Sequence, residues 1–326
     1  MTPIEKLVVK YRLLGLTTEI DTVCGHKACL INVSDDDKIL YIPDEVVGLN
    51  TVINDDGVYL YKSSATGRML TTTTYFTRNL METRIKNLKI IGGAGLRSAD
   101  YMLYNCRVEN IDLTEFDTSH LISMNHIFAY ISYDTQRGHG TQRSPGTTIK
   151  FGNFDTSKVI NMNNAFEYMR YNGELDLSFF KTHRVQKMEG MFKGFDGELN
   201  LSNFDTSNVK CMDEMFGNAK ILNVDLSSFD TKNVESMHGM FASSRCRNIN
   251  LSSFRVPKTK WFINMFNHAE DVELLDMTKM LIPPDVANNA LATKDMFKNS
   301  RIKELRTTDS FIYSKYLDGS TLKANR

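Results

Sequence analysis

Three residues near the N-terminus carry side chains that bind metal ions in many proteins. Cys24, His26 and Cys29 form a Cys-x-His-x-x-Cys cluster. A closed zinc site needs a fourth ligand, and its cysteines and histidines usually come in spaced pairs. No second pair follows, because the other cysteines stand alone in the sequence: Cys106, Cys211 and Cys246. We therefore expect neither a metal site nor a cofactor.

A glycine-rich stretch, "IIGGAGLRS" at residues 90–98, follows a predicted strand. Phosphate-binding loops use glycines in this way, but they also need a lysine, and dinucleotide sites need a different glycine spacing. The stretch has neither feature, so we expect it to tighten a turn. The Gly-x-Ser-x-Gly sequence of many hydrolases does not occur.

The remaining candidates for acid–base chemistry are spread through a repeated sequence pattern. The histidines occupy different places in that pattern: His120, His183, His238 and His268. An aspartate recurs at one fixed place: Asp117, Asp155, Asp205 and Asp230. Such regularity favours a structural task, because aspartate caps turns and helix starts by accepting backbone N–H bonds. The sequence therefore predicts a protein that is not an enzyme. An enzyme with its site in the first 83 residues is an alternative.

The composition limits the class of protein further. The chain has 326 residues, with 39 basic and 39 acidic side chains and 41% hydrophobic residues. Balanced charge argues against a general nucleic-acid binder, which usually carries an excess of Lys and Arg, and against an acidic disordered chain. Five cysteines, an odd number, do not make a disulfide scaffold and fit a reducing compartment better.

The first residues differ from a secretory signal. Charged residues interrupt "MTPIEKLVVKYRLLGL", and no small-residue cleavage site follows. Pro3 suits the first position of a helix and Gly15 can end it, so the stretch predicts a helix over residues 3–14. No run approaches the roughly 18–20 apolar residues that a membrane span requires. We expect a location in the cytoplasm of a host cell or in a virion, with no signal peptide and no membrane anchor.

The most informative feature is an internal repeat. "LNLSNFDTSNVKCMDEMF" at 199–216 is followed by "VDLSSFDTKNVESMHGMF" at 224–241. Six copies align on a first Phe, at steps of 38, 26, 24, 25 and 25, and a second Phe stands twelve residues after each. We name a copy by its first Phe. The predicted repeat core consists of these pairs: Phe116 and Phe128, Phe154 and Phe166, Phe180 and Phe192, Phe204 and Phe216, Phe229 and Phe241, and Phe254 and Phe266.

Each copy predicts one strand and one short helix. The alternating apolar residues of "VDLSSF" favour a strand, and "DTSN" favours a turn or a helix start. Val209, Met212 and Phe216 then fall on one face of a two-turn helix. The 17 methionines mostly recur at fixed places, which favours core packing over metal chemistry. We predict an α/β repeat solenoid, a leucine-rich-repeat-like stack of about seven strand-plus-helix units of about 25 residues.

The two quoted copies resemble the BspA-like, mycoplasma-lipoprotein type of leucine-rich-like repeat. Units of that type read roughly as a Leu-Asp-Leu-Ser strand, Phe-Asp-Thr-Ser, Val, and a Met-x-x-Met-Phe helix. The resemblance is specific from Leu175 to Phe266 and looser before this range. It implies a solenoid that binds macromolecules without a shared catalytic centre. Members are commonly surface adhesins or binding proteins, and many occur in phages and other mobile elements. The absence of a recognised export signal favours the phage or mobile-element type.

The period divides the chain into three predicted parts. Residues 1–83 do not follow the repeat and predict a small N-terminal α+β cap domain, with the helix at 3–14 followed by short strands. Residues 84–300 form the predicted solenoid, with an insertion loop at 131–147 that accounts for the long step. Residues 301–326 predict a C-terminal cap. Such caps cover the open ends of a repeat stack.

A candidate surface for a partner follows from the repeat. The fourth residue after each first Phe falls into one row if the copies stack: His120, Lys158, Arg184, Asn208, Asn233 and Lys258. The insertion adds Arg137, His139 and Arg143 near the first members of this fourth-residue row. Basic residues in this arrangement suit an acidic patch on a protein. The sequence predicts a non-enzymatic macromolecule-binding or structural protein, either an inhibitor of a host complex or a virion component. An adhesin exported without a recognisable signal is the alternative.

Overall fold

The structure is a computed structural model. It describes residues 3–23, 26–34, 36–42, 51–53, 59–62, 69–71, 84–131 and 146–319. The chain divides into two compact units, Met1–Asn161 and Met162–Arg326, and each is described by itself. The boundaries predicted near residues 83 and 301 follow the repeat period and stay predictions. Most of the insertion loop, with Arg137, His139 and Arg143, lies outside the described residues.

The first unit begins with helix α1, Pro3–Leu13, where the sequence predicts a helix. Gly15, with a left-handed φ of 77°, ends it, and its N–H donates to the Arg12 carbonyl at 3.0 Å. Glycine adopts this conformation without the steric cost that a Cβ brings. Val8 of the helix packs against Cys29 and Ile31, which are fully buried in the neighbouring sheet.

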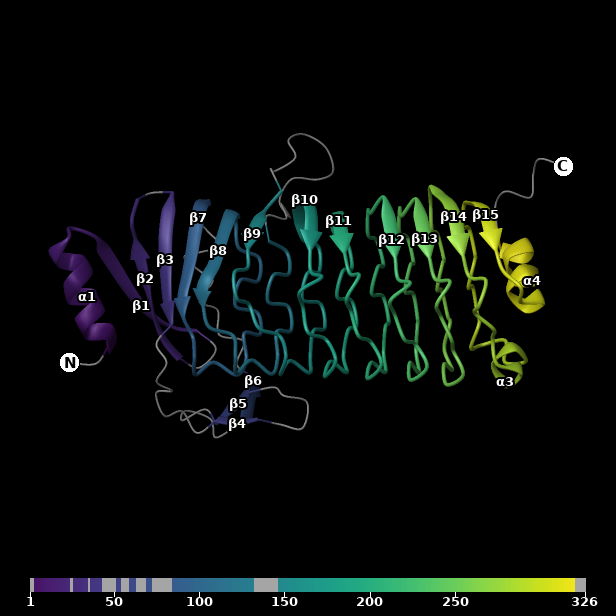
Figure 1. Cartoon of the computed structure of the whole chain (residues 1–326), viewed down its shortest axis with the longest axis horizontal. Coiled ribbons are helices and arrows are strands. Elements are labelled where there is room, and N and C mark those ends of the chain that lie inside the picture. Colours follow the sequence, from purple (N-terminus) through teal and green to yellow (C-terminus); the bar gives the residue numbers. More distant parts are fainter. Residues whose placement is uncertain are drawn as a thin grey trace. The chain divides into compact units, whose positions relative to one another are not determined.

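That sheet joins the non-repeated N-terminal strands to the first repeated ones (Figure 1). Its order is β1 (Thr17–Val23), β2 (His26–Asn32), β3 (Asp37–Ile42), β7 (Ile85–Gly92), β8 (Val108–Phe116) and β9 (Thr148–Lys150). The first three strands pair antiparallel, whereas β3, β7, β8 and β9 pair parallel. A separate antiparallel sheet contains β4 (Thr51–Ile53), β5 (Tyr59–Lys62) and β6 (Met69–Thr71).

The glycine-rich stretch makes the turn after β7. Gly92 and Gly93 have left-handed φ values of 82° and 95°, and the Gly93 N–H donates to the Ile42 carbonyl at 2.9 Å. A Cβ on Gly92 would overlap this same carbonyl oxygen. The glycines therefore allow two backbone segments to approach closely.

The second unit repeats one short strand per copy. Two parallel sheets contain β10 (Arg170–Asp176) with β11 (Asp196–Asn200), and β12 (Asn223–Asp225), β13 (Asn248–Asn250), β14 (Val272–Asp276) and β15 (Ile302–Arg306). Figure 1 shows the last four side by side. Val224, Ile249, Leu275 and Leu305 stand opposite one another in register. The described residues of this unit also form helices α3 (Pro284–Ala287) and α4 (Ser310–Gly319).

The two-turn helix predicted for each copy does not form in the described copies, and a run of turns replaces it. Alternate N–H groups donate in different directions. The N–H groups of Met212, Glu214, Phe216 and Asn218 donate to carbonyls of the next copy at 2.7–3.0 Å. The N–H groups of Met215 and Gly217 donate three residues back, to the carbonyls of Met212 and Glu214 at 3.4 and 2.9 Å. Each turn run is therefore bonded both within itself and to its neighbour.

Left-handed residues explain why the helix is lost. Glu214 and Asn218, two and six residues after Met212, have φ values of 53° and 58°. The same two places are left-handed in the other copies of this unit: Asn164, Tyr168, Gly190, Gly194, Gly239, Ser243, Asn264, His268, Asp295 and Asn299. A residue with a Cβ pays roughly 1–2 kcal/mol for this conformation. The bonds between copies offset this cost by satisfying backbone groups that are otherwise unpaired.

The core of the second unit contains two columns of phenylalanine rings. In the longer column each ring stacks on the next at centroid distances of 5.2–5.7 Å: Phe166, Phe192, Phe216, Phe241, Phe266 and Phe297. Phe180, Phe204 and Phe229 form the second column, at 6.5 and 6.2 Å. All twelve phenylalanines of the predicted repeat core are buried. The column direction follows the strand pairing, so aromatic packing and backbone bonds join the same copies.

Helix α4 covers the end of the longer column. The Tyr316 ring meets Phe297 edge-on at 6.0 Å, and its hydroxyl donates to the Ile302 carbonyl at 2.8 Å. Asp309 caps the helix by accepting the Phe311 N–H at 2.8 Å. Among the described residues, no helix has both the length and the apolar composition needed to cross a bilayer.

Candidate interaction surface

In four of the six copies, an aspartate side chain caps the turn after the first Phe. Asp205 Oδ1 accepts the Ser207 N–H at 2.9 Å. The equivalent bonds are Ser119 to Asp117, Ser157 to Asp155 and Lys232 to Asp230, at 2.9, 3.0 and 3.2 Å. The recurring aspartates therefore cap turns, as expected from their regular spacing, although no helix follows.

These caps make the fold sensitive to acid. The hydrogen bonds from Ser119 and Ser207 hold the pKa of Asp117 and Asp205 below its usual value near 4. A carboxyl group with a lowered pKa in the folded state stabilises the fold above its unfolded pKa. It loses this contribution as the pH falls through the folded pKa. We expect the urea concentration at the midpoint of unfolding to decrease as the pH is lowered below about 4.

The variant Asp205→Asn keeps an acceptor for the turn and removes the titration. It is expected to lose less stability than the parent between neutral pH and acid. Glu235→Gln provides the control, because Glu235 is exposed and no side-chain bond to it is seen among the described residues. If the parent and Asp205→Asn show the same acid response, the cap does not contribute to it.

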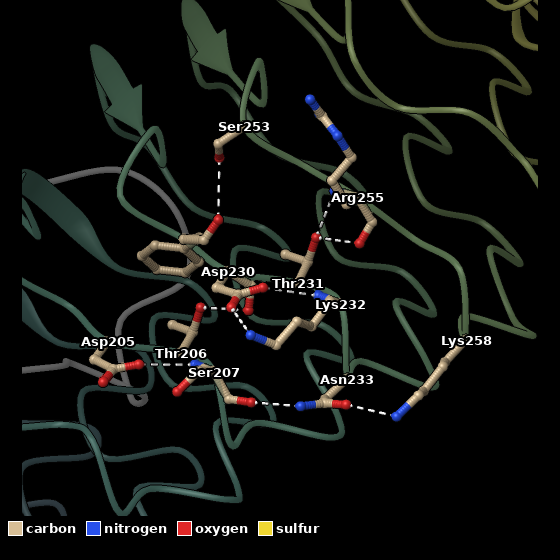
Figure 2. A network of polar contacts seen from close by, with 11 residues as sticks. Asp205, Thr206, Ser207, Asp230, Thr231, Lys232, Asn233, Ser253, Arg255 and Lys258 are labelled. Atoms are coloured by element: carbon tan, nitrogen blue, oxygen red, sulfur yellow. Dashed lines mark hydrogen bonds and ion pairs between the residues drawn. The ribbon is translucent and has the colours of Figure 1, made fainter.

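Buried threonines join the turns of neighbouring copies (Figure 2). Thr206 Oγ1 donates to the Asp230 carbonyl at 3.0 Å, and Thr231 Oγ1 donates to the Arg255 carbonyl at 2.7 Å. Thr231 Oγ1 also accepts the Arg255 N–H at 2.9 Å. The Thr231 hydroxyl thus satisfies two backbone groups of the next copy and the Thr206 hydroxyl satisfies one, which fixes neighbouring turns to each other.

The fourth-residue row is described separately in each unit. In the first unit, His120 and Lys158 are exposed. In the second unit, Arg184 and Lys258 are exposed. Asn208 Nδ2 donates to the His183 carbonyl at 2.7 Å and Asn233 Nδ2 to the Ser207 carbonyl at 2.8 Å.

Lys258 Nζ continues this series by donating to Asn233 Oδ1 at 2.7 Å, as Figure 2 shows. The neutral members of the fourth-residue row thus connect neighbouring copies, and the cationic members present their charge on that support. The sequence pattern placed these residues in one row, but it did not indicate that asparagine amides would bond along it.

The second unit contains a shallow groove that the repeat pattern did not predict. It has a volume of about 440 Å³ and is lined by Arg255, Val256, Pro257, Thr278, Lys279, Leu281 and Thr308. Arg255 stands where four other copies have the capping aspartate, and Pro257 stands where those copies have Ser or Lys. In the sequence, these two departures from the repeat were the feature that could have indicated the groove. We call this site the Arg255 groove.

The thiols show no sign of reactivity in the described part of the chain. Cys24 and the side chain of His26 lie outside the described residues. Burial raises the pKa of Cys29 and Cys106, and it raises the pKa of Cys211 and Cys246 to about 12. A protonated thiol is a weak nucleophile and a poor metal ligand. No group of three or more His, Cys, Asp or Glu side chains is placed to hold a metal ion within the described ranges.

Comparison with known proteins identifies a family. The family described as "Mycoplasma protein of unknown function, DUF285" matches residues 66–138, 142–200 and 194–306. No curated protein and no solved structure matches the chain. The matched residues are well over half of the sequence and include all six copies from Phe116 to Phe266. This agrees with the resemblance of the repeats to mycoplasma proteins. The chain therefore belongs to the DUF285 family of mycoplasma proteins of unknown function.

Proposed function

We propose that this chain is a non-enzymatic protein that recognises a protein partner through the outer turns of its repeats. The observation that carries the proposal is the fourth-residue row of the second unit. Its neutral members, Asn208 and Asn233, bond to neighbouring copies, while Arg184 and Lys258 are exposed. The row therefore presents positive charge on a support fixed by hydrogen bonds.

Such a support favours recognition of an acidic surface. Groups that are fixed before binding lose less conformational entropy when a partner docks. Complementary charge raises the association rate and selects the orientation of the partner. We assign the same role to His120 and Lys158 of the first unit and to Arg137, His139 and Arg143 of the insertion. The leucine-rich-like solenoid of the sequence resemblance would supply the shared surface.

Two settings fit a protein of this kind. We favour a phage or mobile-element protein that inhibits a host complex or belongs to a virion, working inside the host cell. The free thiols of Cys29, Cys106, Cys211 and Cys246 support a reducing compartment. The alternative is an adhesin exported without a recognisable signal, and accessibility to added protease on intact cells distinguishes the two.

The fourth-residue row gives a direct test. The partner is first captured by crosslinking the tagged chain in the organism that encodes it, and is then purified. In the double variant Arg184→Glu and Lys258→Glu, we expect the association rate to fall about tenfold at low salt, because like charges now face the partner. Lys158→Glu and deletion of Thr135–Ser144 test the first unit in the same way.

The matched control is Lys294→Glu, which makes the same change at an exposed lysine that is not a member of the fourth-residue row. Melting temperatures are compared for every variant, because an effect on folding would mimic an effect on binding. Association rates that match the parent in all row variants, with folding intact, would show that the partner docks elsewhere.

A further inference from the structure

We propose that the Arg255 groove binds an acidic segment of a protein partner. In this proposal Arg255 and Lys279 hold a carboxylate, and a neighbouring apolar side chain packs on Pro257 and Leu281. The inference rests on the proposed function, since it assumes a protein partner. It names a separate site for that partner and the chemistry that the site would recognise.

The repeat explains why an arginine can stand at this place. In the copies that start at Phe204 and Phe229, an aspartate caps the N–H two residues later. In the Phe254 copy that later residue is Pro257, which has no N–H to cap. The aspartate is therefore not required, and Arg255 places a positive charge there, as Lys181 does in the Phe180 copy.

The Arg255 guanidinium is fixed at one end and available at the other. Nη1 donates to the carbonyls of Phe254 and Lys279 at 3.1 and 3.2 Å. A guanidinium has five N–H donors, and no bond to the Nε or Nη2 donors is seen among the described residues. In Figure 2 the guanidinium extends away from the paired Asp230 and Lys232. This geometry leaves a fork of donors that suits a carboxylate.

The lining of the groove has positive charge and no carboxylate. Arg255 and Lys279 are both exposed, and neither has an ion pair within the described part of the chain. The two aspartates nearest in sequence already bond to backbone: Asp276 accepts the Thr278 N–H at 3.0 Å, and Asp309 accepts the Ile282 N–H at 2.7 Å. An incoming carboxylate would therefore supply the missing negative charge.

The apolar part of the lining favours an acidic peptide segment over nucleic acid. Pro257 and Leu281 contribute apolar surface, and Leu281 is 60% exposed although it is a large apolar residue. A volume of about 440 Å³ accommodates a few side chains of a peptide. Nucleic acid would instead need a longer run of cations and aromatic rings for its bases, and the lining has no aromatic residue. An acidic residue beside an apolar one fits better.

The test uses a defined peptide, a fluorescein-labelled Gly-Ser-Glu-Leu-Glu-Leu-Ser-Gly, with the full chain. Binding is measured by fluorescence anisotropy at low and at high salt. A second peptide has Gln in place of Glu. The protein variants are Arg255→Gln, Lys279→Gln and Leu281→Asn, and Lys294→Gln is the control that removes one exposed lysine elsewhere.

We expect the Glu peptide to bind the parent and Lys294→Gln within twofold of each other. Arg255→Gln and Lys279→Gln should each weaken binding about tenfold, which is the effect of one charge-assisted bond. The Gln peptide should bind at least about tenfold more weakly. Lys279→Gln keeps the backbone contacts of Arg255, so it tests the site even if Arg255→Gln folds poorly.

Three results would overturn the assignment: no binding of the Glu peptide, equal binding of the Gln peptide, or unchanged binding by Lys279→Gln. The peptide assay needs no natural partner, so its failure removes the Arg255 groove alone. Failure of the proposed function is seen separately, in row variants that capture the partner at the parental rate.

Discussion

Replacing Phe216 with alanine is expected to lower the free energy of unfolding by about 3–5 kcal/mol. Phe216 is fully buried, and its ring stacks between Phe192 at 5.7 Å and Phe241 at 5.2 Å. Alanine would leave a cavity in the middle of the longer ring column and remove both aromatic contacts. The measurement is urea unfolding followed by the fluorescence of Trp261, the single tryptophan, which lies in the same unit.

Phe179→Ala provides the matched control. Phe179 is 41% exposed and meets Phe180 edge-on at 5.1 Å. The substitution therefore removes the same side-chain atoms as Phe216→Ala, but at a position outside the longer ring column. We expect this variant to lose about 1 kcal/mol or less. If Phe216→Ala unfolds at the same urea concentration as Phe179→Ala, the ring column does not have the central role described above.

Gly92→Ala is expected to destabilise the first unit by about 2–5 kcal/mol. The left-handed backbone at Gly92 disfavours any Cβ, and this Cβ would overlap the Ile42 carbonyl oxygen. The two strands meeting at this turn, β3 and β7, would have to move apart. Thermal unfolding followed by far-ultraviolet circular dichroism measures the loss.

Gly173→Ala separates the two causes of that loss. Gly173 has a left-handed φ of 93°, but a Cβ there would have no atom within 4 Å. The free energy of unfolding of Gly173→Ala should therefore decrease only by the conformational cost of about 1–2 kcal/mol. Equal losses in Gly92→Ala and Gly173→Ala would mean that close backbone approach at Gly92 is unimportant.

The strands of the repeats could be predicted because their signal is local. Residues such as Val224 and Ile249 are apolar between polar neighbours, and this alternation fits a strand with one buried face. The buried phenylalanines followed from the same reasoning, since their spacing repeats with the strands. The N-terminal helix was also predictable, because its start and end signals lie within a few residues of each other.

The turn runs could not be predicted because their cause lies in the neighbouring copy. Val209, Met212 and Phe216 have helical spacing, and all three are buried as a helix would bury them. The left-handed residues Glu214 and Asn218 are stabilised by bonds to a copy about 25 residues away. Glycines at the same places in other copies indicated a left-handed backbone there. Glutamate at 214 gave no such indication, because glutamate rarely adopts this conformation.

For the candidate surface too, the features that depend on contacts between copies could not be predicted. The spacing of the copies predicted the fourth-residue row, because equivalent residues align wherever copies stack in register. The Arg255 groove depends on how Arg255, Lys279 and Leu281 from two successive copies lie against each other. Single side chains that depart from a repeat are visible in a sequence, but the space between them is not.

Outside the turn runs, N–H groups such as those of Lys220 and Arg245 donate back to the preceding copy. The forward bonds nevertheless give the turn runs an electrical direction of their own, because their N–H groups point toward the next copy, as from Met212 to Ser236 and from Met237 to Trp261. Peptide dipoles that align head to tail add together, as they do in a helix. Here they add across the chain instead of along it, with the positive end at the last copy. There the Asn299 N–H donates to the Gly319 carbonyl, at the negative end of α4, at 3.0 Å. The final helix therefore places its negative end against the positive end of the turn runs, at the same end of the unit that it covers sterically.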